Sequence, residues 1–332
     1  MEQTKTYKWG IIGPGKIAQK FAAALSLVPG ASLYAVASRD IEKAAAFAAK
    51  YKAPVFYNTY EALAANPEID AVYIATPHTF HHAHTLLCLR HKKAVLCEKP
   101  MSVSYESTLA MVNAARENKT FLMEAMWSRF LPIIEKTRQL VQEGAIGTLK
   151  YLRADFGFAA PYNEAGRLYN LSLGGGSLLD VGVYPLFFAL WLMGKPDSIS
   201  SVAQLARTGA DEIMTAVLKY SNGSVASIAS SINTQLSITA ELGGTEGAIF
   251  LDRPWYKGSQ LQVRKNDAVT QRFSLPYGDN GFEFQVQEVH RCLGLGLTES
   301  DRLPLSFSLL LSSVMDEICR MQKINYSPQG IN

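Results

Sequence analysis

Few features of the sequence are typical of a secreted, membrane or nucleic-acid-binding protein. The chain has only 4 cysteines in 332 residues, without CxxC or CxxH spacing, so we interpret them as reduced, mostly buried thiols with no function. The 32 basic and 29 acidic side chains give a formal net charge of +3, too balanced for the basic surface of a nucleic-acid binder. Charged residues make up 18% and hydrophobic residues 48%, which excludes disorder as the main state. We expect a folded protein that binds no nucleic acid.

A long uninterrupted apolar run is also missing. The longest apolar stretch, 181–193, contains Gly182 and Pro185 and is shorter than the ~20 residues that span a bilayer. Residues 1–8 are polar and lack the apolar core of a signal peptide. We therefore expect no membrane segment and a cytoplasmic location.

The length predicts about two domains of roughly 150 residues each. Up to residue 125, short apolar runs alternate with helical stretches, which is typical of βαβ units and a parallel sheet. The expected strands are 7–12, 32–38, 55–57, 71–75, 94–97 and 121–123, and the helices between them include 17–27 and 41–51. We predict an α/β protein whose residues 1–125 form a doubly wound, Rossmann-type nucleotide-binding domain.

The second half of the sequence has longer strands and fewer helices. A helix is expected at 132–143, and further helices at 176–193, 283–293 and 305–322. The expected strands are 150–158, 198–207, 212–220, 224–234, 236–243 and 260–265. We predict that residues 126–332 form an α+β domain with an open, mainly antiparallel sheet, which binds the substrate and another subunit.

Two details of this second sheet carry further expectations. Asn222-Gly223 between two apolar runs predicts a tight hairpin in which both turn residues have positive φ. No charged residue occurs from Gly223 to Ala240, so both faces of the sheet can be covered, one of them by a second copy in a homodimer. The alternative to the dimer is a solvent-exposed sheet face that carries serine and threonine in place of charged residues.

A glycine-rich turn follows the first strand and opens the first helix. GPGKIA at 13–18 matches G-x-G-x-x-G/A, with Gly13 for the tight turn and Gly15 where the backbone approaches a pyrophosphate. The free N–H groups of the helix N-terminus, including those of Lys16 and Ile17, favour an anion. The alternative is a purely structural glycine turn.

The end of the second strand indicates which dinucleotide binds. NAD enzymes place an acidic residue there, whereas this chain has Ser38 followed by Arg39. A serine does not repel a 2′-phosphate and a guanidinium can bind it, so NADP(H) is preferred over NAD(H). We interpret Asp40 as the N-cap of the following helix rather than as a ribose ligand.

Four histidines lie close together after the fourth strand. Thr76, Pro77, His78 and His81 follow that strand at the carboxyl edge of the sheet and should line the cofactor groove. His78 and His82 have the i, i+4 spacing of helical zinc sites, but no carboxylate or cysteine in the segment completes a metal shell, so we predict no metal. Most of these histidines, with His84, are expected to be solvated or to cap helices.

Two further motifs contain side chains that can move a proton. Glu98-Lys99-Pro100 ends the fifth strand, where Pro100 restricts Lys99 to extended backbone and can be cis; an exposed strand-end lysine is the alternative. In the second domain, Asp180 and Tyr184 are spaced i, i+4 on an otherwise apolar helix. The alternative to a catalytic role is that Asp180 is a buried cap of its own helix and that Tyr184 is packed in the core.

With these motifs the chain resembles the glucose-fructose oxidoreductase/inositol dehydrogenase (Gfo/Idh/MocA) family over its whole length. The resemblance rests on GIIGPGKIA at 10–18, TPHTFH at 76–81, CEKP at 97–100 and GGGSLLDVGVY at 174–184. LMEAMWSRFLP at 122–132 and the tyrosine at 184 are similar to the branch of dimeric dihydrodiol dehydrogenase and NADP-dependent D-xylose dehydrogenase. His78 departs from the asparagine that the family often has.

The resemblance implies a catalytic group of Lys99, Asp180 and Tyr184, without a metal. Tyr184 would be the acid/base, Lys99 its electrostatic partner and a hydrogen-bond donor to the substrate, and Asp180 the group that orients either of them. Glu98 and Lys99 would also contact the cofactor. Aromatic side chains and hydrogen-bond donors between the motifs suit a polyhydroxylated cyclic substrate, although we assign about half of them to the core instead. They are Trp127, Arg129, Phe130, Phe156, Phe158, Tyr162, Arg167 and Tyr169.

The expected activity is an NADP(H)-dependent oxidation or reduction at a CH–OH group. The substrate would be a cyclic sugar of the D-xylose or D-glucose type at its anomeric carbon, or a trans-dihydrodiol. The alternatives are an inositol or polyol dehydrogenase with the same chemistry and a non-catalytic NADP-binding regulator. Intact Lys99, Asp180 and Tyr184 argue against the regulator.

Overall fold

The computed structural model describes residues 5–278 and 280–327. The chain divides into two compact units. The first unit consists of Met1–Trp127, Asp279–Ser312 and Ser327–Asn332, and the second of Ser128–Gly278 and Ser313–Tyr326. The sequence predicts a single domain from residue 126 to 332, whereas the structure groups residues 279–312 with the first unit.

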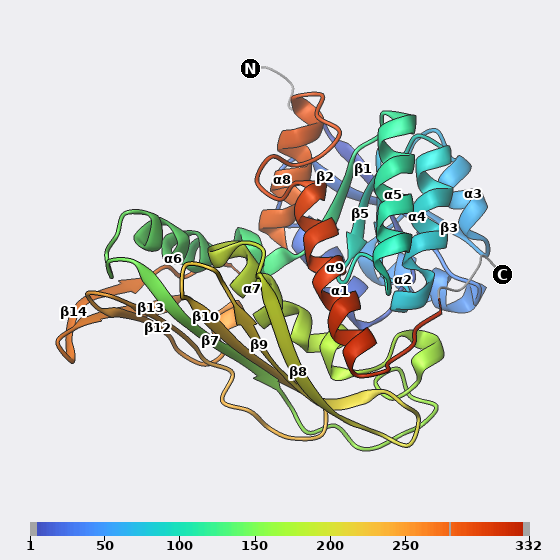
Figure 1. The fold of residues 1–332 in the computed structure, drawn as a ribbon. Coiled ribbons are helices and arrows are strands. Elements are labelled where there is room, and N and C mark those ends of the chain that lie inside the picture. The colour runs from blue at the N-terminus through green and yellow to red at the C-terminus, as the bar shows by residue number, and fades with distance from the viewer. Residues whose placement is uncertain (1–4, 279, 328–332) are drawn as a thin grey trace. The chain divides into compact units, whose positions relative to one another are not determined.

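The first unit contains a six-stranded parallel sheet in the order β3-β2-β1-β4-β5-β6, the Rossmann order expected from the sequence (Figure 1). Its central strands consist almost entirely of buried residues, as parallel strands covered on both faces should. The strands are β1 (Tyr7–Ile12), β2 (Ala31–Ala37), β3 (Val55–Tyr57), β4 (Ala71–Ile74), β5 (Ala94–Glu98) and β6 (Leu122–Ala125).

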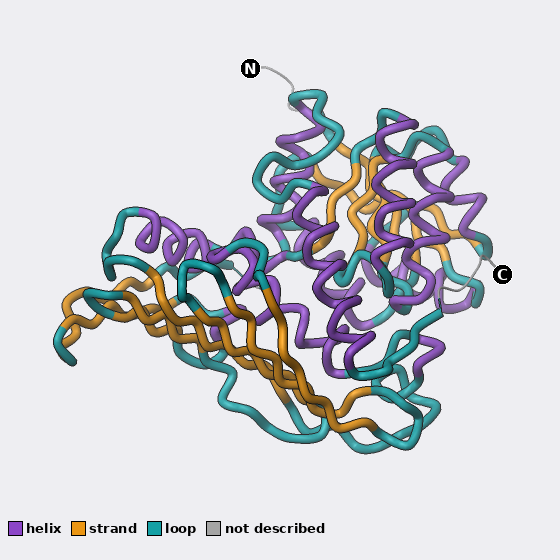
Figure 2. Tube along the Cα trace, in the orientation of Figure 1, coloured by secondary structure: helices purple, strands orange, loops and turns teal. Residues whose placement is uncertain are grey.

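Helices flank this sheet on both faces (Figure 2). Three of them begin where the side chain of Asp40, Thr59 or Ser104 accepts a hydrogen bond from a backbone N–H three residues later, the pattern of an N-cap. Their bounds are α1 (Lys16–Leu25), α2 (Ile41–Tyr51), α3 (Tyr60–Ala65), α4 (His81–Arg90) and α5 (Tyr105–Asn118), with the short 3₁₀ helix η1 (His78–Phe80) before α4. The apolar core of this unit contains residues of α3, α4 and α5 together with Leu305.

Residues 279–312 complete the first unit through contacts that are distant in sequence. In α8 (Glu283–Gly294), the His290 Nε2 atom accepts a hydrogen bond of 3.0 Å from Trp9 Nε1 on β1. The Tyr7 and His290 rings are 4.5 Å apart, and Leu122 N donates to Thr298 O at 3.1 Å. These contacts explain why α8 belongs with the nucleotide-binding sheet.

The second unit has an eight-stranded sheet in the order β14-β13-β12-β11-β7-β10-β9-β8 (Figure 1). All neighbouring strands are antiparallel except β7 and β10, so the expected open, mainly antiparallel sheet is confirmed. Its strands are β7 (Leu149–Gly157), β8 (Ser198–Leu205), β9 (Asp211–Lys219), β10 (Val225–Ser231), β11 (Ala240–Gly244), β12 (Ala248–Leu251), β13 (Gln260–Lys265) and β14 (Ala268–Ser274).

Two strands were not predicted and one was predicted too long. β12, Ala-Ile-Phe-Leu, is a short apolar run with alternating burial that the prediction overlooked, whereas six of the seven side chains of β14 are exposed, so β14 lacks the apolar pattern of a strand. The stretch 236–239, expected to begin a strand, is a loop in which Ile238 has a φ of +58°.

The Asn222-Gly223 hairpin forms between β9 and β10, but its turn differs from the expected one. Gly223 has a φ of +79°, whereas Asn222 does not have positive φ. Gly223 N donates to Tyr220 O and Tyr220 N donates to Ser224 O. This is a three-residue loop with glycine in the left-handed region, so only the glycine position is conformationally demanding.

The helices of the second unit are α6 (Pro132–Gln142) and α7 (Val183–Met193), and α9 (Leu305–Met321) passes from the first unit into the second at residue 313. The stretch Leu171–Met193 is long and apolar enough to cross a membrane by length and composition, and 83% of its window is buried. Because α7 packs on β7 and β10, we interpret this stretch as part of the core of its unit.

Candidate active site

The glycine-rich turn after β1 has the geometry that a dinucleotide requires. Gly13 has a φ of +87°, and a Cβ there would lie 2.9 Å from backbone atoms of Ala75 and Thr76, so only glycine fits. A Cβ on Gly15 would meet no atom of the described residues within 4 Å, although its φ of −88° is ordinary. The space beside Gly15 is open, and α1 begins at Lys16 without a side-chain cap. The backbone at Gly15, Lys16 and Ile17 therefore fits a pyrophosphate.

The end of β2 carries one exposed guanidinium. Ser38 is buried, and its Oγ accepts a 3.2 Å hydrogen bond from Asp40 N. Asp40 caps α2 by accepting from Lys43 N at 3.2 Å, so the N-cap prediction is confirmed. Arg39 is exposed, and its guanidinium lies 5.8 Å from the Phe80 ring. The end of β2 therefore presents an exposed cation to an anion.

A small hollow lies next to Arg39. Arg39 also hydrogen-bonds Tyr60, whose pKa is raised because burial outweighs the effect of the guanidinium. The hollow is lined by Arg39, Tyr60, Thr76, Pro77, Phe80 and His84. Residues that follow β2 and β4 therefore meet at the carboxyl edge of the sheet, as the order of the strands predicts.

The histidines after β4 are not solvated, and that prediction is wrong. His78, His81 and His84 are buried, and His82 is half-buried. The two His81 ring nitrogens lie 2.9 Å from Pro100 O and 2.9 Å from Thr76 O, and burial lowers the pKa of His81 to about 4. His81 thus ties the turn after β4 to the turn after β5. Sequence patterns missed this because the packing partner is 19 residues away.

The turn after β5 is held from several sides. Lys99 is only 8% exposed, so the alternative of an exposed strand-end lysine is wrong, and the Lys99-Pro100 peptide bond is cis. The Tyr73 hydroxyl donates to Glu98, and Lys99 N donates to Glu98 Oε2 at 3.2 Å. Both Glu98 and Lys99 therefore have defined positions.

Glu124 at the end of β6 supports the same turn and was not predicted. Its carboxylate accepts from Met101 N at 2.9 Å and from Ser308 Oγ at 2.6 Å. Burial raises the pKa of Glu124 to about 7. The signal in the sequence is a glutamate inside an otherwise apolar strand, LMEA.

Asp180 and Tyr184 lie where a π-helical turn meets α7. We expected one helix over 176–193, but Leu178–Gly182 forms a π turn (η4) that precedes α7. Both residues are buried, and Asp180 Oδ1 accepts from Arg167 at 2.6 Å. A π turn has one residue more than an α turn, and such turns are frequent at functional sites.

Aromatic rings surround Tyr184 in its own unit. The ring of Tyr184 lies 5.6 Å from the ring of Phe156 and 5.2 Å from that of Tyr256. Phe156 in turn stacks on Tyr256 at 4.1 Å and lies 6.5 Å from the half-buried Phe158. Tyr256 was not predicted, because it lies in a short 3₁₀ helix, Trp255–Lys257, that no motif marks.

The other proposed substrate residues are distributed over different environments. Tyr169 is buried against Tyr162, which is 44% exposed. Phe130 is buried, and Trp127 is buried against Phe282 at 4.9 Å. Arg129 is 2% exposed, forms an ion pair with Glu135 at 2.5 Å and lies 3.9 Å from the Trp191 ring. These contacts of Arg129 are those of a packed structural residue.

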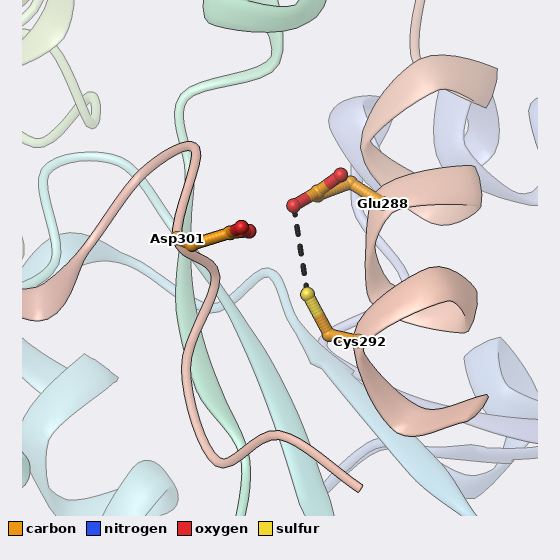
Figure 3. A group of neighbouring side chains, drawn as sticks. All are labelled: Glu288, Cys292 and Asp301. Atoms are coloured by element: carbon orange, nitrogen blue, oxygen red, sulfur yellow. Dashed lines mark hydrogen bonds between the residues drawn. The ribbon is translucent and has the colours of Figure 1, made fainter. Parts of the chain in front are cut away.

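One cluster in the first unit has the donor types of a metal site. Ligand atoms of Glu288, Cys292 and Asp301 lie within 4.8 Å of one another (Figure 3). However, Arg291 and Arg302 form ion pairs with Glu288, Arg291 pairs with Asp301, and burial raises the pKa of the Cys292 thiol to about 12. Because guanidinium groups already supply the positive charge, we interpret this cluster as an ion-pair network that joins α8 to the following loop.

Comparisons with known proteins agree with this architecture. Residues 7–126 match the model of an oxidoreductase family with an NAD-binding Rossmann fold, and residues 134–250 match the GFO/IDH/MocA C-terminal domain. The chain is 38% identical to trans-1,2-dihydrobenzene-1,2-diol dehydrogenase of Bos taurus, over 94% of this chain and 95% of the relative. Its counterpart in Xenopus tropicalis is 34% identical, over 96% of this chain and 99% of the relative.

Solved structures show the same fold. An aldose-aldose oxidoreductase from Caulobacter crescentus has a TM-score of 0.88 and 25% identity, over 96% of this chain and 98% of that one. A 3-ketoreductase from Actinomadura kijaniata, in complex with NADP and TDP-benzene, has a TM-score of 0.87 and 24% identity, over 95% of this chain and 98% of that one. The protein described here belongs to the Gfo/Idh/MocA oxidoreductase family and has its NAD-binding Rossmann domain and its C-terminal domain.

Proposed function

We propose that this protein is an NADP(H)-dependent dehydrogenase that oxidises a ring CH–OH group of a trans-dihydrodiol or a cyclic sugar. The observation that carries the proposal is the similarity, at 34–38% identity over nearly the whole chain, to relatives named trans-1,2-dihydrobenzene-1,2-diol dehydrogenase. An aldose is the second candidate substrate, favoured by the likeness to an aldose-aldose oxidoreductase at 25% identity.

The cofactor part of the proposal rests on the first unit. Gly13, Gly15, Lys16 and Ile17 would hold the pyrophosphate, Ser38 and Arg39 the 2′-phosphate, and Thr76, Pro77, His78, His81, Glu98 and Lys99 would line the rest of the groove. Support comes from the open space beside Gly15 and from the exposed guanidinium of Arg39 at the end of β2. When bound, the nicotinamide supplies the acceptor for the hydride that leaves the substrate carbon.

The chemical part of the proposal assigns a role to each ionisable group. Tyr184, in its phenolate form, takes the proton of the substrate hydroxyl while the C–H bond breaks, and Lys99, its electrostatic partner, donates a hydrogen bond to the substrate oxygen. Asp180, held by Arg167 at 2.6 Å, orients the hydroxyl group. The rings of Phe156 and Tyr256 beside Tyr184 offer apolar faces to a ring-shaped substrate.

The first experiment measures turnover and its dependence on Tyr184. Purified protein is assayed with NADP⁺ and NAD⁺ against trans-dihydrodiols, aldoses and inositols. A positioned acid/base contributes about 10²–10⁴ in rate, so Tyr184→Phe should lower kcat at least roughly a hundredfold. Tyr220→Phe is the matched control, because Tyr220 is a buried tyrosine of the same unit at the turn after β9. Near-normal turnover of Tyr184→Phe would remove this tyrosine from the mechanism, and NADP(H) binding without turnover of any compound would favour a regulator.

We also propose a homodimer that forms through the outer face of the second sheet. Helices α6 and α7 contact this sheet, and the side chains that alternate with its buried ones include Tyr151, Val202, Val217, Ala229 and Phe250. Val202 is 74% exposed, and an apolar side chain so exposed favours burial by a partner. Light scattering should give about twice 36.4 kDa, and Ala229→Arg should give the monomer mass. A monomeric native protein at micromolar concentration contradicts the dimer.

The proposed compartment is the cytoplasm. All four cysteines are free and buried, which is compatible with a reducing environment. Cell fractionation with an antibody against the protein tests this assignment, and recovery in a membrane or secreted fraction would contradict it.

A further inference from the structure

A buried carboxylate in the second unit contacts the segment that carries Asp180 and Tyr184. Asp211, the first residue of β9, is fully buried. Its Oδ2 atom accepts hydrogen bonds from Ser177 Oγ at 2.6 Å and from Leu178 N at 2.7 Å. Its Oδ1 atom lies 3.4 Å from the Tyr326 hydroxyl, as a second and more distant acceptor of that proton. Asp211 lies 31 residues after Asp180 in the sequence and belongs to none of the motifs.

The groups around Asp211 fix the chain just before the π turn. The Ser177 and Ser230 hydroxyls lie 2.8 Å apart, and because the Ser177 proton goes to Asp211, Ser230 donates to Ser177. The Tyr326 hydroxyl lies 2.9 Å from Gly175 O. A Cβ on Gly176 would lie 2.2 Å from Asp211 Oδ1, and Gly176 has a φ of +132°, so only glycine allows this approach. Residues of β9, β10 and 326 thus hold positions 175–178.

Asp211 also supplies a helix cap that the segment itself lacks. Ser177 is the N-cap residue of the π turn, but its own side chain makes no capping hydrogen bond. The N–H of Leu178, the first residue of the turn, is satisfied by Asp211 from another strand. A carboxylate at the start of the helical segment also interacts favourably with the helix dipole. Asp180 follows Leu178 by two residues and Tyr184 by six, so this cap sets where the segment begins.

A buried carboxylate is a costly way to cap a helix. Burial raises the pKa of Asp211 to about 6, so at neutral pH the folded protein keeps an ionised group away from water. An exposed serine or threonine cap would carry no such cost. The segment that bears both candidate catalytic side chains is therefore capped by a group whose burial costs more free energy than an exposed cap would.

We propose that Asp211 is a positioning residue that holds the start of the π turn, so that Asp180 and Tyr184 have the orientation needed for proton transfer. This inference rests on the proposed function, because it concerns the geometry of the same acid/base group. Displacement of a reacting group by about 1 Å can cost roughly a hundredfold in rate. Asp211 itself touches neither substrate nor cofactor in this proposal.

The test separates kcat from cofactor binding and from folding. Asp211→Ala should lower kcat by about ten- to a hundredfold and leave the Kd for NADP(H), measured by fluorescence titration, within about twofold of the wild type. Asp211→Asn should restore kcat to within about fivefold of the wild type, because the amide oxygen still accepts from Leu178 N. A merely structural role would not produce a selective loss of kcat with rescue by the isosteric amide.

The matched control is Asp197→Ala in the same unit. Asp197 Oδ2 accepts from Ser221 N at 2.6 Å, the same kind of carboxylate-to-backbone bond, at the hairpin after β9. A kcat of folded Asp211→Ala within threefold of the Asp197→Ala value overturns the inference. If Asp211→Ala does not fold, Tyr326→Phe removes only a hydroxyl from the network and should lower kcat by about two- to fivefold. An unchanged kcat in that variant also overturns the inference.

Failure of this inference is distinguishable from failure of the proposed function. If Tyr184→Phe loses activity and Asp211→Ala keeps it, the acid/base assignment stands and only the positioning role of Asp211 is lost. If Tyr184→Phe keeps activity, the proposed function fails, whatever Asp211→Ala does.

Discussion

Several ionisable side chains near the candidate motifs are buried in this protein, and their protonation depends on the fold. Glu124 and Asp211 have pKa values raised by burial, to about 7 and about 6, whereas burial lowers those of His81 and His84 to about 4. Each of these four side chains has hydrogen-bond partners. At neutral pH the two histidines are neutral, Asp211 is mostly ionised and Glu124 is about half ionised, so the two carboxyl groups carry the cost of a buried charge.

The first prediction concerns Glu124 and pH. The folded pKa of about 7 exceeds the reference value of 4.5, so the folded protein binds the proton more tightly, and stability falls as pH rises from about 4.5 to 7. The shift corresponds to roughly 3 kcal/mol. Gln at this position still accepts from Met101 N through its amide oxygen, its amide N–H can donate to Ser308 Oγ instead, and it cannot ionise. In urea unfolding, the free energy of unfolding of Glu124→Gln minus that of the wild type should increase by about 2–3 kcal/mol from pH 5 to pH 8.

Subtracting the wild-type value at each pH removes the contributions of the buried histidines and of Asp211, because these are unchanged in the variant. A stability difference between Glu124→Gln and the wild type that does not vary with pH would contradict the pKa assigned to Glu124.

The second prediction concerns Arg39 and the choice of cofactor. A charged hydrogen bond contributes about 1.5–3 kcal/mol, so Arg39→Ala should weaken NADP(H) binding by roughly ten- to a hundredfold and leave NAD(H) binding within about twofold. Lys43→Ala is the control, because Lys43 is an exposed cation of the same helix region that pairs with Asp40. Equal losses for both cofactors would refute the preference for the 2′-phosphate.

At the scale of elements, the third prediction separates two glycines of one turn. Gly15→Ala places its Cβ in open space at an ordinary φ, so the cofactor-free protein should be as stable as the wild type or up to about 1 kcal/mol more stable. The same methyl group would occupy the space that we propose for the pyrophosphate, so we expect NADP(H) affinity to fall at least tenfold. Calorimetry of binding and thermal unfolding measure the two effects separately.

Gly13→Ala provides the contrast in the same turn. Its Cβ would clash with the backbone after β4 at a φ of +87°, so both stability and affinity should fall. If Gly15→Ala binds NADP(H) normally, the cofactor does not approach the backbone at this residue.

Elements with a local signal could be predicted from the sequence, and elements defined by distant partners could not. The bounds of β1, β3 and α2 agree with the prediction because apolar runs and the Asp40 cap mark them. The π turn was missed because no local signal marks it, and the side chains that contact its start, Asp211 and Ser230, lie on β9 and β10. The exposed strand β14 has no apolar alternation, so its pairing with β13 is invisible in the sequence.

The same distinction applies to the candidate site. The glycines of the turn after β1 and the tripeptide at 98–100 are recognisable because glycine and proline act on their own backbone. The supporting residues Glu124, Tyr256 and Asp211 contact segments that are 23 or more residues away. Only the fold brings them to those segments.

At the scale of the whole molecule, the first unit is assembled from segments that are far apart in the chain. Residues 1–127 contribute the sheet and five helices, and α8 and Leu305 come from residues 279–312. Trp9 on β1 is fully buried and bonded to His290 on α8. The nucleotide-binding sheet therefore lacks part of its cover without α8.

The fourth prediction follows for a fragment of residues 1–127. Without α8, Trp9 and its neighbours would be exposed to water, so the fragment should lack a cooperative thermal transition and should not bind NADP(H). Circular dichroism and fluorescence titration compare it with the full chain, in which both properties are expected. A fragment that unfolds cooperatively and binds the cofactor would show that α8 is dispensable.

The discontinuous first unit also constrains the order of events during synthesis. After residue 127 has been added, the ribosome must add residues 128–312 before the segment 279–312 of this unit is complete. At about 5–20 residues per second this takes roughly 10–40 s. During that time the apolar surface that later receives α8 is uncovered on the nascent chain, and a chaperone that binds such surfaces has its longest opportunity to act there.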